Sequence, residues 1–229
     1  MQRSWRNDTD KLTFISCLPL SSQPLSFSTG VEESGIHRNA ATTTRIKPEE
    51  DDAPDRMLGD VNLFLKLEDE DENIDNAGEE ESSHKLSPIV GELELMIAQK
   101  EKQRHGFGRA SLLCFMNYIA IHEVEIVRGF LRSHARNQGQ GQRNERNQEY
   151  GLDQAGDAKL VYLVVRIGAT NERSLALFEG LGFRKVTDEP NYFGELELRK
   201  YGFDASDARG LMEQFGVQRY NEVLYGGEE

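Results

Sequence analysis

One feature constrains this fold most. It is an alternating segment that leads directly into a glycine-bearing turn and then into a long apolar segment. In PIVGELELMIA (88–98) every second side chain is apolar, which separates Leu93, Leu95 and Ile97 from Glu92, Glu94 and Met96. A period of two predicts a strand with one buried face. The segment ASLLCFMNYIAIH (110–122) is too long and too apolar for a strand. It predicts a buried helix, and residues 100–109 form the turn between the two elements.

Further strands and helices are predicted on both sides of this unit. Runs rich in β-branched and aromatic residues predict strands over 12–18, 57–67, 159–168, 184–187 and 192–201. Asn171 can cap a helix that ends before Gly182, and a short helix is expected over 206–215. The order strand, strand, strand, helix, strand, helix, strand, strand predicts an α/β chain with a mixed sheet.

The net charge of −13 comes from two segments of the chain. Residues 49–55 hold five acidic side chains and residues 68–81 hold nine, with no Lys or Arg among them. Without these fourteen charges the chain would be close to neutral, near +1. Such runs are typical of solvated, disordered insertions. The absence of a basic stripe argues against nucleic acid as the main partner.

Composition also sets expectations for metal, membrane and compartment. Cys17 and Cys114 form neither a disulfide framework nor a CxxC metal spacing, so no metal is expected. No run of eighteen consecutive apolar residues predicts a membrane span, and the first residues lack the apolar core of a signal peptide. We expect a cytoplasmic protein without a membrane partner.

We expect one domain over residues 1–202, followed by a tail over 203–229 with a short helix. Within the domain, three low-complexity segments are predicted to be disordered insertions, namely 21–55, 68–87 and 123–157.

The turn QRHGFG (103–108) carries the strongest local signal for a ligand. Glycines at alternate positions let the backbone approach a ligand closely, and the start of the following helix presents unpaired N–H groups that suit a phosphate. Arg104 and Arg109 can add charge-assisted hydrogen bonds. A dinucleotide fingerprint fits less well, because Ser111 stands where its third glycine belongs. A glycine-rich connection that binds nothing is the other alternative.

Two motifs resemble those of the GNAT acetyltransferases. Gln103-x-x-Gly106-x-Gly108 matches the Q/R-x-x-G-x-G/A loop that holds the coenzyme A pyrophosphate in that superfamily. The segment NERSLALFEGLGF (171–183) resembles its N-x-x-S-x-x-L-[FY]-x-x-L-G-F helix element. Residues 1–15, 57–66, 90–122 and 159–200 together look like the N-acetyltransferase 9-like proteins of eukaryotes. In that family the MQRSW-like segment lies well inside the chain, so we expect the first strand and helix to be missing here.

The resemblance implies a GNAT acyl-CoA N-acyltransferase fold, a mixed and mostly antiparallel sheet with a splayed central strand pair flanked by helices. It implies an N-acetyltransferase that moves acetyl from acetyl-CoA, a co-substrate, to an amine of a protein or peptide by direct attack in a ternary complex. The alternative is a non-catalytic acyl-CoA-binding or interaction protein, because of the missing N-terminal part. Phe178 also occupies the position at which many GNAT enzymes carry the tyrosine that protonates the thiolate.

Site residues follow from the resemblance and from the alternating strand. Proton removal from the amine needs a carboxylate, and Glu94 is favoured over Glu92 because it lies nearer the thioester. The residues expected to bind the coenzyme are Leu95, Met96, Ile97, Gln103, Arg104, His105, Gly106, Phe107, Gly108, Arg109, Asn171, Ser174 and Phe178.

Overall fold

The computed structural model describes residues 8–19, 46–68, 88–138, 159–217 and 220–222. In chain order the elements are β1 (Lys11–Cys17), β2 (Met57–Leu67), β3 (Ile89–Ile97), the 3-10 turn η2 (Lys100–Lys102), α2 (Phe107–Gln138), β4 (Leu160–Gly168), α4 (Glu172–Gly180), β5 (Arg184–Lys185), β6 (Glu195–Tyr201) and α5 (Ala205–Gln214). The predicted order of strands and helices is therefore confirmed, with the last strand pair shorter than expected.

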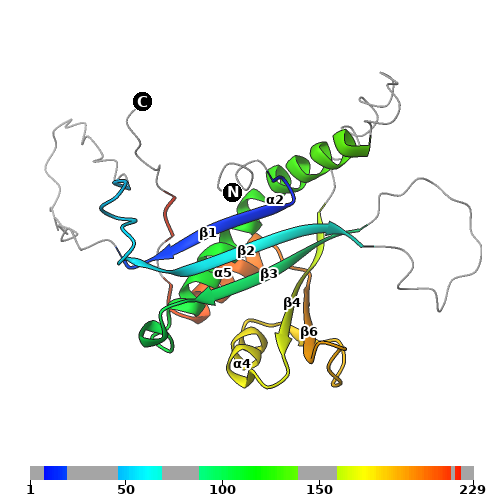
Figure 1. The fold of residues 1–229 in the computed structure, drawn as a ribbon. Coiled ribbons are helices and arrows are strands. Elements are labelled where there is room, and N and C mark those ends of the chain that lie inside the picture. The colour runs from blue at the N-terminus through cyan, green and yellow to red at the C-terminus, as the bar shows by residue number, and fades with distance from the viewer. Residues whose placement is uncertain (1–7, 20–45, 69–87, 139–158, 218–219, 223–229) are drawn as a thin grey trace, which may run out of the picture.

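The strands form one six-stranded sheet in the order β1-β2-β3-β4-β6-β5 (Figure 1). All neighbours are antiparallel except β3 and β4, which run parallel because α2 connects them. The mixed sheet predicted from the order of elements is confirmed, and so is its mostly antiparallel pairing, which the resemblance to GNAT acetyltransferases implies.

The parallel pair separates halfway along its length. Pairing between β3 and β4 starts at Ile89 and Leu160 and ends at Glu92 and Val164. Beyond that point β3 continues to Ile97 and β4 to Gly168, and the two strands diverge (Figure 1). The predicted splay of the central strand pair is therefore present.

The main core lies on the face of the sheet that the helices cover. Helices α2 and α5 lie behind the sheet in Figure 1 and contact each other. Alternate side chains of the strands point toward them and are at most 2% exposed, among them Leu63, Leu93, Leu163 and Leu198. Helix α4 adds Leu175 and Phe178 to the same core. Burial of this apolar layer is the main stabilising contribution to the fold.

Helix α2 extends beyond the sequence prediction. Residues 123–138 belong to the segment predicted to be a disordered insertion, but they continue the helix past a kink at His122 (φ −105°, ψ 15°). Val127 is fully buried and Phe130 is 5% exposed, both in the main core. Sparse apolar residues give only a weak helical period here. Tertiary packing supplies the stability of the helix that the local sequence does not. The remainder of that segment, 139–157, lies outside the described residues.

Within the described part of the chain, α2 is the one helix long and apolar enough to cross a membrane, over Phe107–His134. Its apolar side chains Leu112, Phe115, Met116 and Ile119 are at most 3% exposed and belong to the main core.

The other predicted insertions fall largely outside the described residues. Of 21–55, the structure describes residues 46–55, which are mainly turns. Of 68–87, it describes only Glu68. The predicted C-terminal helix is present as α5, capped by the Asp204 carboxylate, which accepts from the backbone N–H groups of Ser206 and Asp207.

The face of the sheet opposite α2, called the open face below, carries no helix among the described residues. Three of its side chains are nevertheless buried, namely Val90, Tyr162 and Val164. They lie in the part of the face that is crossed by Arg166, Glu197 and Arg199, since these residues alternate with the core side chains of β4 and β6. Long charged side chains can cover apolar surface with their aliphatic stems.

Candidate active site

The predicted phosphate-binding turn is a compact loop between β3 and α2. The Gln103 side-chain amide donates to the Ile97 carbonyl at 2.9 Å, and His105 Nδ1 lies 2.9 Å from the Gln103 carbonyl oxygen. Arg104 (φ 66°) and Gly106 (φ 87°) both adopt the left-handed region. Glycine adopts that region without strain, whereas for arginine it is uncommon. These bonds turn the chain from the end of β3 into the first turn of α2.

Helix α2 starts at Phe107, so Gly108 and Arg109 belong to its first turn rather than to the loop. The first helical bond runs from the Ala110 N–H to the Gly106 carbonyl at 3.0 Å. The N–H groups before Ala110 are those that a helix start leaves without an intrahelical partner. The first turn holds no acidic side chain. The positive end of α2 can therefore receive an anionic phosphate.

Glycine at position 108 allows α2 to approach β3. A Cβ there would lie 3.2 Å from Leu95 Cδ2, tighter than most side-chain contacts. At Gly106 a Cβ would meet nothing within 4 Å, so that glycine is required by its backbone conformation and not by space.

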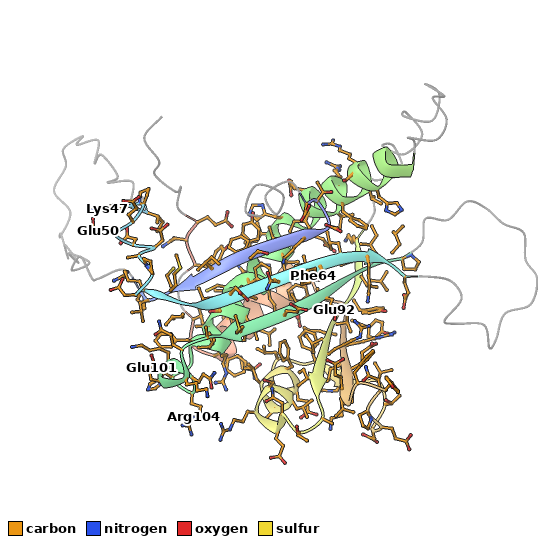
Figure 2. The ribbon with its side chains drawn as sticks, in the orientation of Figure 1. Lys47, Glu50, Phe64, Glu92, Glu101 and Arg104 are labelled. Carbon is orange, nitrogen blue, oxygen red and sulfur yellow. The ribbon has the colours of Figure 1, made fainter. Side chains whose placement is uncertain are left out.

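Two arginines lie on or next to this loop, Arg104 and Arg109, and their side chains have different surroundings. Arg104 lies on the loop and is exposed (Figure 2). The Arg109 guanidinium lies over the Phe215 ring, 4.7 Å from its centroid. Phe215 directly follows α5, so the C-terminal helix fixes a cation at the start of α2. Sequence reasoning missed Phe215, because only the fold brings it to the loop.

The splay places main-chain groups of β3 opposite the diverging β4. The Ala98 N–H bonds to the Leu58 carbonyl of β2, and main-chain groups alternate in direction along a strand. Those of Leu95 and Ile97 therefore point toward β4, in the stretch where the β3–β4 pairing has ended. The Ile97 carbonyl is taken by Gln103, which leaves Leu95 as the main candidate to bond a ligand there.

Met96 does not lie as its predicted role requires. Its main-chain groups point toward β2 by the same alternation, and its side chain is 52% exposed on the open face. Of the three strand residues predicted to bind the coenzyme, the geometry brings Leu95 and Ile97 to the splay.

Helix α4 begins beside the splayed end of β4. The Asn171 side-chain oxygen accepts from the Ser174 N–H at 3.2 Å, so the predicted cap is present. This bond leaves the amide group of Asn171 available. Phe178 is 5% exposed and meets Phe183 edge-on at 5.2 Å. It belongs to the core, so the structure does not bring it to the surface of the splay.

The two predicted carboxylates lie in different surroundings. Glu92 Oε2 forms ion pairs with Arg166 and, at 3.4 Å, with Lys66. Glu92 lies beside Phe64 of β2 on the open face (Figure 2). Glu94 is exposed and lies opposite Asn62 in the β2–β3 register. For Glu94 no hydrogen bond or ion pair occurs within the described part of the chain.

A chain of charges extends from Glu92 across β4 and β6. Arg166 also binds Glu197 at 2.9 Å, and Glu197 accepts from Arg199 Nε at 2.7 Å. Burial alone would raise the pKa of the Glu197 carboxyl, but the hydrogen bond and charge of Arg199 and the charge of Arg166 bring that pKa below its ordinary value. Glu92 is thus part of a neutralised network, and Glu94 is the freer carboxylate of the two.

A pocket of about 540 Å³ lies between α2, β1 and residues 220–222. Its walls are mainly aromatic and aliphatic, including Phe14, Phe115 and Tyr118. At its rim the Glu222 carboxylate lies 3.0 Å from His122 Nε2 and accepts from the Tyr220 hydroxyl at 3.0 Å. Of the predicted site residues, Phe107 lines this pocket, whereas the loop at 103–106 and Glu94 do not.

Comparisons with known proteins give the following relatives. No protein-family model matches the chain. It is 28% identical over 209 residues to an N-acetyltransferase 9-like protein of Schizosaccharomyces pombe, covering 86% of this chain and 73% of that protein. It is 33% identical over 118 residues to the alpha/beta-tubulin-N-acetyltransferase 9 of Drosophila melanogaster, covering 52% and 39%. The protein of the same name from Mus musculus is 27% identical over 202 residues, covering 87% and 51%.

The chain therefore spans only about half, or less, of the mouse and fly proteins. Among solved structures, Arabidopsis thaliana NAA60 in complex with acetyl-CoA matches with a TM-score of 0.39 at 12% identity, over 67% of this chain and 70% of that one. This likeness is too slight to support an argument.

Proposed function

We propose that this chain, which is similar in sequence to N-acetyltransferase 9-like proteins, transfers an acetyl group from acetyl-CoA to an amine of a protein or peptide. The observation that carries the proposal is the splay of β3 from β4, which opens directly beside the loop at 103–106 and the start of α2. A nucleotide pyrophosphate and an extended thioester arm need those two features side by side.

Holding the coenzyme falls to three parts of the chain. The N–H groups at the start of α2, with Arg109 and Arg104, would bind the pyrophosphate. The main chain of Leu95 would bond the arm in the way that one strand bonds another. A backbone N–H in this stretch would also stabilise the oxyanion that forms when the thioester carbonyl is attacked.

The transfer itself is a direct displacement. The amine nitrogen of the acceptor forms a bond to the thioester carbonyl carbon, and the carbon–sulfur bond then breaks to release the coenzyme thiolate. Glu94 would accept the proton of the amine, because it is exposed and is the carboxylate left outside the ion-pair network. Phe178 has no proton to donate and is buried, so water would protonate the thiolate.

The acceptor is proposed from the relatives. Two of them are named for alpha/beta-tubulin, so we propose a protein amine, with tubulin as the first acceptor to test. Such an acceptor fits a cytoplasmic protein, which is the compartment we propose.

Calorimetric titration of acetyl-CoA tests the coenzyme site. We expect saturable one-to-one binding to residues 1–229. Replacing Gly106 by Val should abolish it, because a β-branched residue at φ 87° is strained. Gly129→Ala is the matched control, since a Cβ at position 129 meets nothing within 4 Å on the far half of α2. Absence of binding by a folded sample would contradict the proposal.

Transfer is then measured with purified tubulin and labelled acetyl-CoA. Incorporation of label that depends on both partners supports the enzyme. Coenzyme binding without transfer to tubulin or to a mixture of peptide amines would instead indicate a non-catalytic acyl-CoA-binding protein.

A further inference from the structure

Asn62 is a buried polar side chain on the open face, at the end of the sheet where β3 leaves β4. It is 7% exposed. The Thr13 hydroxyl donates to its Oδ1 at 2.7 Å, and its Nδ2 donates to the Asp60 carboxylate at 3.1 Å. A buried amide with both ends bonded has little freedom to turn. The direction of the Asp60 carboxylate is thereby set by β1 and β2 together.

Two cross-strand rows run side by side on this part of the open face. The first row consists of Thr13, Asn62 and Glu94, and the second of Ile15, Asp60 and Met96. Asp60 and Glu94 are therefore diagonal neighbours, about 7–8 Å apart between their Cα atoms. Ile15 and Met96, on either side of Asp60, are 55% and 52% exposed.

The charge of these two carboxylates is not compensated as that of Glu92 is. Glu92 pairs with Arg166 and Lys66, whereas Asp60 and Glu94 form no ion pair within the described residues. Glu94 lies in the stretch of β3 beyond its last pair with β4, and Asp60 of β2 lies opposite Met96 of that stretch. A cationic group that approaches the splay from the open face would therefore meet two anions there.

We propose that Asp60 is an acceptor-binding residue, whose carboxylate binds the protonated amine of the acceptor beside Glu94, and that Asn62 is the positioning residue that aims it. The inference rests on the proposed transferase function. The amine arrives as an ammonium ion between the two carboxylates and gives one proton to Glu94. The neutral nitrogen then attacks the thioester carbonyl carbon, the carbon–sulfur bond breaks to release the coenzyme thiolate, and the second proton lost by the nitrogen passes through water to that thiolate.

Steady-state kinetics of Asp60→Asn tests the binding role. Asparagine keeps the size of the side chain and the oxygen that accepts from Asn62, but it lacks the charge. We expect the KM for tubulin to rise at least about tenfold, while kcat and the KM for acetyl-CoA stay within about twofold, the pattern of lost substrate binding. Glu213→Gln on α5 is the matched control, since it makes the same chemical change behind the sheet and should leave all three constants unchanged.

The positioning role of Asn62 is tested by a double-mutant cycle. Asn62→Ala should raise the KM for tubulin by about threefold or more, and the variant that combines Asn62→Ala with Asp60→Asn should be no worse than Asp60→Asn alone. A merely structural role would instead lower acetyl-CoA binding and make the two effects additive. Calorimetric binding of acetyl-CoA by each variant shows that its fold is intact.

Binding of tubulin to the protein without turnover separates failure of this inference from failure of the proposed function. Wild-type transfer with an unchanged KM in Asp60→Asn would overturn the inference and leave the function standing. If the wild type transfers no acetyl group but binds tubulin, and Asp60→Asn weakens that binding, the proposed function is overturned. The proposed binding of the acceptor by Asp60 then still stands. Neither transfer nor binding would overturn both.

Discussion

Gly59 of β2 lies so close to Met96 of β3 that a Cβ at position 59 would come within 1.8 Å of the Met96 carbonyl oxygen. The atoms in the way belong to the backbone of β3 and cannot turn aside. Glycine at this position therefore lets the end of β3 lie tightly against β2, at the point where it has left β4.

Gly59→Ala should weaken both the fold and the coenzyme site. The added methyl must push the end of β3 away from β2 and toward the splay. We expect a loss of about 1–3 kcal/mol in the free energy of unfolding, typical of overpacking, and a fall of at least about tenfold in acetyl-CoA affinity. Urea unfolding and calorimetry measure the two effects. Gly180→Ala in α4, where a Cβ meets nothing within 4 Å, should leave acetyl-CoA affinity unchanged; an equal loss there would refute the steric explanation.

Phe215→Leu should weaken acetyl-CoA binding without unfolding the protein. The leucine keeps apolar contacts but removes the ring beneath the Arg109 guanidinium. A cation–π contact at an exposed site contributes about 0.5–1 kcal/mol, so we expect a two- to fivefold rise in Kd. Phe193→Leu, on an 81% exposed ring in the β5–β6 turn, serves as control. An unchanged Kd in Phe215→Leu would mean that Arg109 does not contact the coenzyme.

Two substitutions of Asn171 separate the helix cap from the coenzyme contact. Asn171→Asp keeps an oxygen for the Ser174 N–H, so the stability of the fold should be preserved. Its negative charge should repel the coenzyme phosphates and raise the Kd for acetyl-CoA. Asn171→Ala should instead lower the free energy of unfolding by about 1 kcal/mol. If Asn171→Asp binds acetyl-CoA as the wild type does, the predicted contact is wrong.

The ion-pair network on the open face predicts a pH dependence of stability. The pKa of Glu197 is lowered in the folded protein, so its contribution is present at neutral pH and is lost as the pH falls through that lowered pKa. Arg166→Met removes one of the two arginines that lower the pKa of Glu197. Chemical unfolding between pH 3 and 7 should show a shallower loss toward acid in this variant. Parallel curves for the two proteins would exclude this role of Arg166.

Phe178→Tyr tests whether the tyrosine typical of many GNAT enzymes can be restored here. Phe178 packs against Phe183 in the core, so an added hydroxyl would be buried and would find its partner only by rearrangement. We expect a loss of about 1–3 kcal/mol in stability and no gain in kcat. A substantial rise in kcat would show that the side chain reaches the thiolate after all.

Local patterns predicted most of the elements. The physical reason is that strands and helices each place buried side chains at a characteristic spacing along the sequence. The alternation over 88–98 marks β3, and Asn171 and Gly182 bracket α4 as expected. The resemblance to N-acetyltransferase 9-like proteins is confirmed by relatives in yeast, fly and mouse, and with it the acyltransferase class. The prediction of disorder over 123–138 is wrong, because burial of Val127 and Phe130 stabilises a helix that the weak helical period of this segment does not indicate.

The sequence by itself determined which segments alternate, which turn can approach a phosphate and which family the chain resembles, since all of these depend on neighbours along the chain. Tertiary structure decided how the charged groups are used. Glu92 and Glu94 look equivalent in the sequence, yet the pairing of β3 with β4 gives Glu92 an arginine partner, and the pairing with β2 places Glu94 beside a fixed Asn62 and Asp60. Contacts between residues distant in the chain set those environments, and no local pattern encodes them.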